Sequence, residues 1–275
     1  PVQIVSWGHP ETTGIDTIDY FLSSSLFETN ISKKNYSEKL ICLSTFPIYY
    51  EPPENIKLEK NRFDLNLPLK ANLYACPQSL FKLHPDFDLI LAKILEKDPN
   101  GYIVFIGGPG IIKYWIKTLR KRWSNTFPII NNRSIFINRL SIEEFICLCK
   151  CVDVLLDPVH FGGGNSFLEA MLVGTPTITK PGSHLRANIT SAGYKQMNIS
   201  NAPIVYTSEE YVNLSINLAK NKNKNLKLRK DSVKAAKNYL FKNNFALIQF
   251  EKFLEKAHFE AKSGSKIKDG YVIKE

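Results

Sequence analysis

The chain has 275 residues, of which 44% are hydrophobic and 23% charged, and its 36 Lys and Arg against 26 Asp and Glu give a net charge of +10. This composition is that of a globular protein, which excludes collagen-like, disordered and coiled-coil classes. No apolar run reaches the roughly 18 residues that a membrane span requires. The segment 220–275 carries nine of the ten net positive charges. The basic excess therefore indicates a solvated helical face, or alternatively a contact with an acidic surface, and we expect no nucleic-acid partner.

The N-terminal segment 1–70 predicts two short strands and a linker. Residues 2–6 and 18–22 are strand-like, and a loop rich in Gly, Pro and Thr separates them. A polar stretch then leads to residue 40. Residues 47–70 contain four prolines and many charges without a sustained period, which is typical of a linker.

From residue 71 the pattern becomes regular, because strand-like and helical runs alternate. This alternation predicts one α/β lobe over 71–206, a Rossmann-like parallel sheet with helices on both faces. Three more helical patterns follow within 207–261, and residues 262–275 read as a ragged basic tail. The strand-like runs are 71–76, 102–106, 134–137, 153–157 and 175–179, and the helical runs are 86–97, 111–123, 141–151, 165–173 and 184–197.

Five cysteines are present, and three of them alternate at the end of a helical pattern as Cys147, Cys149 and Cys151. Alternate positions on a helix point about 200° apart, so these thiols cannot converge on one metal ion. We expect reduced, structural cysteines in a cytoplasmic protein.

The most informative loop follows the strand-like run 153–157. Gly162, Gly163 and Gly164 allow a ligand to approach the backbone closely, and the next residues begin a helix whose free N–H groups favour an anion. Glu169 lies on the same helix face as Asn165, where its carboxylate would reach two ribose hydroxyls. The loop is neither a Walker A motif nor a Gly-x-Gly-x-x-Gly fingerprint. A nucleotide site is one interpretation, and a flexible loop with a surface glutamate is the other.

Several segments together carry a family resemblance. They are Pro1–Gly14, Cys76–Pro85, and the run from Phe161 to Gly182 that reads FGGGNSFLEAMLVGTPTITKPG. In this order they resemble the O-GlcNAc transferase and SPINDLY-like glycosyltransferases. The resemblance implies a GT-B fold, in which two Rossmann-like lobes face each other across a cleft. Residues 1–46 would end the N-terminal lobe, 47–70 would link the lobes, and 71–206 would bind a UDP-sugar.

The resemblance also implies roles for single residues. Lys82 matches a lysine that neutralises the donor diphosphate, and Glu169 matches the acidic residue on the ribose. Lys82 and His9 are the candidate catalytic residues. The remaining candidates for substrate binding are Gln78 and Ser79, the loop positions Gly162, Gly163, Gly164, Asn165 and Ser166, and Pro10, Thr12 and Thr13 at the lobe interface near the acceptor.

Weaker candidates flank this set. His160 borders the glycine loop and would either meet the nucleotide or cap the end of the strand. Arg186 follows near the same edge, with a solvated surface role as its alternative. Arg139 is the one cation after the run 134–137, where the family carries basic residues and histidines. Some family members have a histidine at the position of Gly164, so phosphate contacts differ there.

Asp86-Phe87-Asp88 has the Asp-x-Asp form that metal-dependent glycosyltransferases use. Acids at the start of a helix also favour its dipole, and we adopt that interpretation. A lysine and a helix N-terminus can stabilise the charge that develops on a leaving UDP. We therefore expect no metal ion and no cofactor, with UDP-sugar as a substrate.

The expected function is that of a GT-B glycosyltransferase which moves N-acetylglucosamine or glucose from UDP to an acceptor, with a polypeptide favoured by the resemblance. The alternative is a noncatalytic module that binds a nucleotide sugar or another protein. Because strand 2–6 needs neighbours that we do not find in the sequence, we expect a fragment that lacks an N-terminal lobe or repeat region of the same protein.

Overall fold

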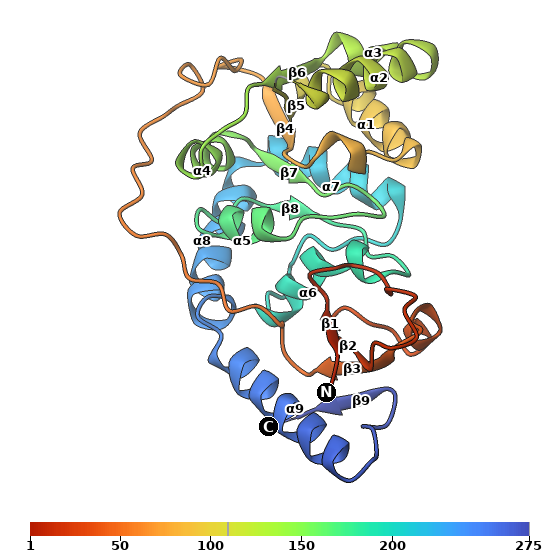
Figure 1. Ribbon diagram of the computed structural model, residues 1–275. Helices are drawn as coiled ribbons and strands as arrows, with labels where there is room; N and C mark the ends of the chain where they lie inside the picture. Colours follow the sequence, from red (N-terminus) through yellow and green to blue (C-terminus); the bar gives the residue numbers. More distant parts are fainter. Residues whose placement is uncertain (109, 275) are drawn as a thin grey trace.

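Two parallel β-sheets organise the chain, and they lie toward opposite ends of the molecule (Figure 1). The computed structural model describes residues 1–108 and 110–274. The larger sheet has the strand order β6-β5-β4-β7-β8, and every neighbouring pair is parallel. All five strands of the predicted α/β lobe are thus confirmed. Their bounds are β4 Asn72–Cys76, β5 Gly101–Ile106, β6 Ser134–Ile137, β7 Val154–Leu156 and β8 Thr177–Ile178.

Helices cover both faces of this sheet, as predicted. Successive residues of β4 point to opposite faces, so that Leu73 lies in one hydrophobic cluster and Tyr74 in the other. The Leu73 cluster contains residues of α4, α5 and α6, and the Tyr74 cluster contains residues of α1, α2 and α7. The helices are α1 Pro85–Lys97, α2 Ile111–Thr126, α3 Pro128–Asn132, α4 Ile142–Cys151, α5 Asn165–Met171, α6 Ile189–Gln196 and α7 Ser208–Lys220.

Local capping fixes where several of these helices begin. The His84 ring accepts a hydrogen bond from the Asp86 N–H, and Pro85 occupies the first turn of α1. Ser141 with Glu144 at α4, and Thr207 with Glu210 at α7, form reciprocal capping boxes. These caps satisfy backbone N–H groups that would otherwise lack partners.

The strand order of the larger sheet reverses between β4 and β7. The chain leaves β4 toward β5 and β6 on one side, and later occupies β7 and β8 on the other. In a sheet of this kind the loops at the carboxyl ends of the two central strands separate and leave a crevice, which is where ligands bind. Here those are the loops after Cys76 and after Leu156.

The smaller sheet has the order β1-β2-β3-β9 and joins the two ends of the chain. Its strands are β1 Ile4–Ser6, β2 Tyr20–Ser24, β3 Lys39–Leu43 and β9 Tyr271–Ile273. The prediction that strand 2–6 lacks neighbours is wrong, because β1 pairs with β2 in parallel. Strand β3, in a segment that we took as largely polar, was not predicted.

The predicted ragged tail is also wrong for residues 271–273. This segment pairs with β3, and Ile273 is buried. A short apolar run among lysines carries almost no local signal, and its strand conformation comes from pairing with a segment near the other end of the chain.

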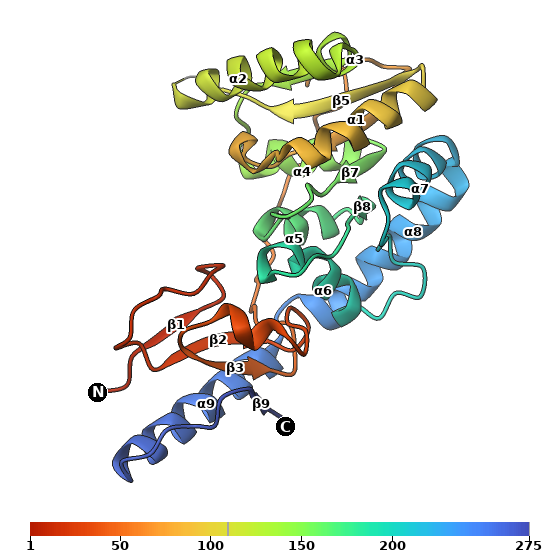
Figure 2. The same cartoon turned by 90° about the vertical axis from the view of Figure 1, so that its right-hand side faces the viewer.

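The C-terminal helices return the chain from the larger lobe to the smaller sheet (Figure 2). Helix α8 (Lys222–Ala235) continues into a π-turn at Ala236–Leu240, and α9 (Asn244–Lys262) then packs on β3 and β9. Phe253 of α9 meets the Tyr20 ring at 5.7 Å between centroids, in a cluster that includes Ile41 and Ile273.

The linker prediction for 47–70 is consistent with the structure, where this segment contains neither helix nor strand (Figure 1). Arg62 fastens it to the larger lobe, because its guanidinium donates to the Ala71 carbonyl at 2.7 Å and to Asp153 at 3.0 Å. Within the described residues, no helix is long and apolar enough to cross a membrane.

Replacing Phe253 by Ala should lower the free energy of unfolding by about 3–5 kcal/mol, because the ring is fully buried between α9 and the smaller sheet. Urea denaturation measures the change. Phe250→Ala, on the same helix at a 40% exposed position, is the matched control and should cost less than about 1.5 kcal/mol. Equal losses for the two variants would contradict the packing of α9 on the sheet.

Candidate nucleotide-binding site

Two loops meet at the point where the strand order reverses. The loop after β4 supplies Gln78 and Lys82, and the loop after β7 supplies Gly162 and leads to Ser166. The Gln78 amide donates to the Ser166 hydroxyl at 2.6 Å, and the Lys82 ammonium donates to the Gln78 carbonyl and to the Gly162 carbonyl, each at 3.0 Å. These bonds cross from one loop to the other, so the predicted residues form one constellation at the crevice.

Lys82 is the centre of this constellation. Its side chain is partly buried, and its ammonium lies 4.3 Å from the centroid of the Phe161 ring. Burial lowers the pKa of Lys82, and the buried Asp157 opposes that effect. Within residues 1–108 and 110–274, no carboxylate lies within ion-pair distance of the ammonium. The cation is therefore held by neutral carbonyl oxygens and an aromatic face.

The glycine loop is packed too closely for side chains at two of its three glycines. A Cβ on Gly162 would lie 2.6 Å from an Asp157 carboxylate oxygen, and one on Gly163 would lie 2.9 Å from both Gln78 and Ser166. A Cβ on Gly164 would meet no atom within 4 Å. The structure therefore leaves room for a side chain at Gly164 but not at its two neighbours.

Asp157 supports the loop from behind and was not among the predicted site residues. Its carboxylate accepts hydrogen bonds from the Gly163 N–H at 2.7 Å and from the Thr179 hydroxyl at 2.8 Å. Burial raises its pKa to about 6, even though these hydrogen bonds act in the opposite direction. The sequence could have indicated Asp157 by its position. It directly follows an apolar strand, and at that edge of the sheet the next loop folds back over the strand end.

Glu169 lies one turn into α5 and is half-buried, and its carboxylate makes no hydrogen bond to a described residue. Burial raises the pKa of this carboxyl group. Burial also raises the pKa of Tyr50 to about 12, with a smaller contribution from the charge of Glu169. The predicted role of Glu169 stays a prediction.

Arg186 joins the two lobes at this crevice. Its guanidinium donates to the His160 carbonyl at 3.2 Å and forms an ion pair with Glu11, while its own carbonyl accepts from the Gly162 N–H at 2.9 Å. The loop between β1 and β2 is thus fastened to the glycine loop. Sequence reasoning named Arg186 as a candidate for substrate binding but did not predict this pairing with Glu11.

The other predicted residues of the β1–β2 loop face Glu38 or solvent. Thr12 and Thr13 both donate to Glu38, at 2.7 and 2.5 Å. Burial alone would raise the pKa of Glu38, but these hydrogen bonds outweigh it and hold the pKa at about 2. His9 is exposed and Pro10 half-buried, and their predicted acceptor role stays a prediction.

The remaining candidates are dispersed. Ser79 and Asn165 are exposed beside the constellation. His160 is exposed, and its ring contacts Asp86 rather than the glycine loop. Arg139 follows β6, two strands away from β4, and lines a separate hollow with Lys60 and Asp64.

The Asp-x-Asp sequence separates into two environments. Asp88 is buried, and its carboxylate accepts two hydrogen bonds from Arg122 and one from the Trp123 indole. Asp86 is exposed at the start of α1. The two carboxylates therefore do not form a shared pair, and the contacts of Asp88 support the interpretation of that acid as part of the packing of the helix.

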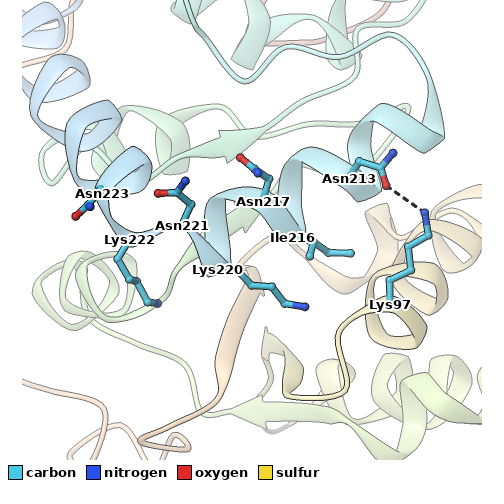
Figure 3. A pocket seen from close by; sticks show the side chains of 8 residues that line it. All are labelled: Lys97, Asn213, Ile216, Asn217, Lys220, Asn221, Lys222 and Asn223. Carbon is cyan, nitrogen blue, oxygen red and sulfur yellow. Dashed lines mark hydrogen bonds between the residues drawn. The ribbon is translucent and has the colours of Figure 1, made fainter.

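A groove of about 720 Å³ lies elsewhere, along α7 and the start of α8 (Figure 3). It is lined by Lys97, Lys220, Lys222 and several asparagines. Lys220 and Lys222 pair with the buried Asp98 and Asp153, which precede β5 and β7. This groove is thus at the amino ends of the strands, opposite the crevice, and two of its lysines are neutralised.

A doubly wound parallel sheet with a lysine and a close-packed glycine loop at its reversal point is the arrangement of nucleotide-binding α/β lobes. The family model described as glycosyl transferase family 41 matches residues 48–247. The chain belongs to this family, and the predicted family resemblance is confirmed.

Relatives of known name agree with this assignment. The chain is 26% identical over 266 residues to the probable UDP-N-acetylglucosamine–peptide N-acetylglucosaminyltransferase SEC of Arabidopsis thaliana, covering 94% of this chain and 26% of that protein. It is 24% identical to the UDP-glucose:protein N-beta-glucosyltransferase of Actinobacillus pleuropneumoniae serotype 5b, covering 89% and 37% respectively. The chain thus spans between a quarter and two fifths of these relatives.

Solved structures agree on the fold. A mutant of the Thermobaculum terrenum O-GlcNAc transferase superposes with a TM-score of 0.77 at 20% identity, covering 92% of this chain and 48% of that one. The Anabaena protein HepE in complex with UDP and glucose superposes with a TM-score of 0.54 at 15% identity, over 87% and 64%. The expected fold, a Rossmann-like parallel sheet like the C-terminal lobe of GT-B glycosyltransferases, is confirmed.

Gly162→Ala should destabilise the protein by about 1–3 kcal/mol, because the added methyl group would overlap the Asp157 carboxylate in a packed interior. Thermal or urea unfolding measures the loss. Gly164→Ala is the matched control and should change stability by less than about 0.5 kcal/mol. Equal effects at the two positions would contradict the described packing.

The pH dependence of stability should change in Asp157→Asn. Because burial raises the pKa of Asp157 from 3.8 to about 6, its contribution to stability is full below about pH 4 and is lost as the pH rises through 6. Between pH 4 and 7 the stability of the wild type should therefore fall by about 3 kcal/mol relative to Asp157→Asn. Urea unfolding at several pH values gives this difference, and parallel profiles would contradict the raised pKa.

Proposed function

We propose that this chain is the donor-binding part of a glycosyltransferase that transfers N-acetylglucosamine or glucose from a UDP-sugar to a protein. Membership of glycosyl transferase family 41 supports the class of enzyme. The names of the relatives support both the UDP-sugar and the protein acceptor. The observation that carries the proposal is Lys82, a partly buried cation at the crevice with no carboxylate partner among the described residues.

The diphosphate of the donor would complete the surroundings of Lys82. An ammonium removed from water without an anion is unfavourable, and a bound phosphate would supply the missing negative charge. As the glycosidic bond breaks, the leaving UDP gains negative charge next to the same ammonium. Lys82 would therefore stabilise the transition state more than the bound substrate, which is what raises the rate.

Three neighbouring features support the rest of the donor's position. Gly162 and Gly163 lack side chains where the backbone lies against Gln78 and Asp157, so the loop is held in a fixed shape. Glu169 is half-buried and has no hydrogen-bond partner for its carboxylate among the described residues, so it would be free to accept from the ribose hydroxyls. In this proposal the reaction needs no metal ion, because Lys82 and the start of α5 provide the positive charge.

The acceptor would enter from the side of the smaller sheet. The Arg186–Glu11 ion pair places the β1–β2 loop, which contains His9, next to the glycine loop. A protein acceptor near His9 would then face the sugar at the crevice. We also propose the cytoplasm as the site of action, in keeping with the free cysteines of the chain.

Isothermal titration with UDP tests the donor site. The chain should bind UDP, and Lys82→Ala and Glu169→Ala should each weaken binding roughly 10- to 100-fold, since each removes a charge-assisted hydrogen bond. Lys93→Ala and Glu96→Ala, at exposed positions on α1, are the matched controls and should bind like the parent. Absence of binding at millimolar UDP, or unchanged affinity in the two site variants, would refute the donor site. Sugar transfer from a UDP-sugar to a protein would contradict the noncatalytic alternative.

A further inference from the structure

Three side chains of metal-binding types converge between the start of α1 and the residue that precedes the glycine loop. They are His84 and Asp86 at the start of α1, and His160 between β7 and the glycines. One ligand atom from each lies within 4.8 Å of the other two. All three side chains are more than half exposed, so an ion can reach them from solvent.

The distances among these atoms are close to those of a coordination shell. Asp86 Oδ2 lies 2.8 Å from His160 Nε2 and 3.4 Å from His84 Nδ1. Ligand atoms bound at about 2.0–2.2 Å to a tetrahedral ion are separated by roughly 3.4 Å. To share one ion, His84 Nδ1 would exchange the hydrogen bond that it accepts from the Asp86 N–H for a bond to the metal, and the two histidine ligand atoms would have to approach each other. The exposure of the three side chains leaves a fourth position for water.

The backbone conformation brings the His160 ring toward the start of α1, where His84 and Asp86 lie. His160 has a positive φ of 72°, a conformation that few residues other than glycine adopt, and its ring turns toward α1. The rings of His84 and His160 meet edge to face at 4.8 Å between centroids. Asp86 and His84 are held by the first turn of α1, which Pro85 begins.

We propose that His84, Asp86 and His160 form a binding site for a divalent transition-metal ion such as Zn²⁺. Two imidazoles and one carboxylate suit zinc and its neighbours, whereas Mg²⁺ and Ca²⁺ prefer oxygen ligands alone. The bound ion would fasten the glycine loop to the start of α1, and thus join the two loops that carry Lys82 and Gly162. This site is separate from the donor chemistry and does not rest on the proposed function.

The cysteines do not offer a comparable site. Cys147 and Cys149 are buried in the hydrophobic core of the larger lobe, and only Cys151 of the three is partly exposed. A zinc titration of the folded chain therefore reports on accessible histidines and carboxylates, and single substitutions can assign the signal.

Titration of Zn²⁺ into the protein at neutral pH, without nucleotide, tests the site by calorimetry and by the shift in Tm. We expect one ion per chain and a higher Tm in its presence. His160→Ala and Asp86→Asn should each weaken Zn²⁺ binding by more than about tenfold and abolish the Tm shift. Loss of a residue that only hydrogen-bonds a metal ligand already costs about tenfold in affinity, and these two residues would be ligands themselves. A large excess of Mg²⁺ should leave Zn²⁺ binding unchanged.

His258→Ala, at an exposed position on α9, is the matched control and should bind Zn²⁺ like the parent. Circular dichroism and the Tm without metal show whether each variant is folded, and Asp86→Asn leaves the helix start almost unchanged in shape. Absence of saturable Zn²⁺ binding, or binding that survives both site substitutions, would overturn the proposal. Because UDP is absent from this titration, its result is independent of the test of the donor site.

Discussion

The proposed donor site depends on the partial desolvation of one side chain, that of Lys82. Lys82 lies at the reversal point of the larger sheet, bonded to two neutral carbonyl oxygens and set against the Phe161 ring. Carbonyl dipoles compensate a desolvated cation only in part. The acid that raises its pKa most is Asp157, which is itself engaged by Gly163 and Thr179. A bound anion beside Lys82 would therefore complete the compensation of its charge.

The close packing of the glycine loop follows from the same requirement. Lys82 reaches the Gly162 carbonyl in a loop whose backbone lies against Asp157 and Gln78, where a side chain would not fit. Two hydrogen bonds hold the loop, from the Gly163 N–H to the Asp157 carboxylate and from the Gly162 N–H to the Arg186 carbonyl. Because the backbone is bonded on both sides, it is already arranged when a ligand arrives, and little ordering is needed on binding.

The larger lobe could be predicted well from the sequence and the smaller sheet poorly, for a physical reason. The strands and helices of residues 71–206 are long enough to show their hydrophobic period, and each strand pairs with others of the same local segment. Strand β9 is very short and takes its conformation from β3, far away in the chain. Among the site residues, Gln78, Lys82 and Gly162 follow adjacent strands, so topology alone brings them together. The hydrogen bonds from Thr12 and Thr13 to Glu38 depend on the geometry of the side chains, which the local sequence pattern does not reveal.

The distribution of charge separates the donor site from the basic character of the whole chain. Nine of the ten net charges belong to the segment 220–275, and Lys220 and Lys222 are paired with buried aspartates at the amino ends of the strands. The crevice at the carboxyl ends has instead one partly desolvated lysine, beside an Arg186 guanidinium that Glu11 already neutralises. A desolvated charge in a low-dielectric setting acts strongly over a short distance, whereas exposed lysines are screened by salt within about 10 Å. In the proposed donor site, selection of an anion would therefore rest on the burial of Lys82 rather than on the net charge of +10.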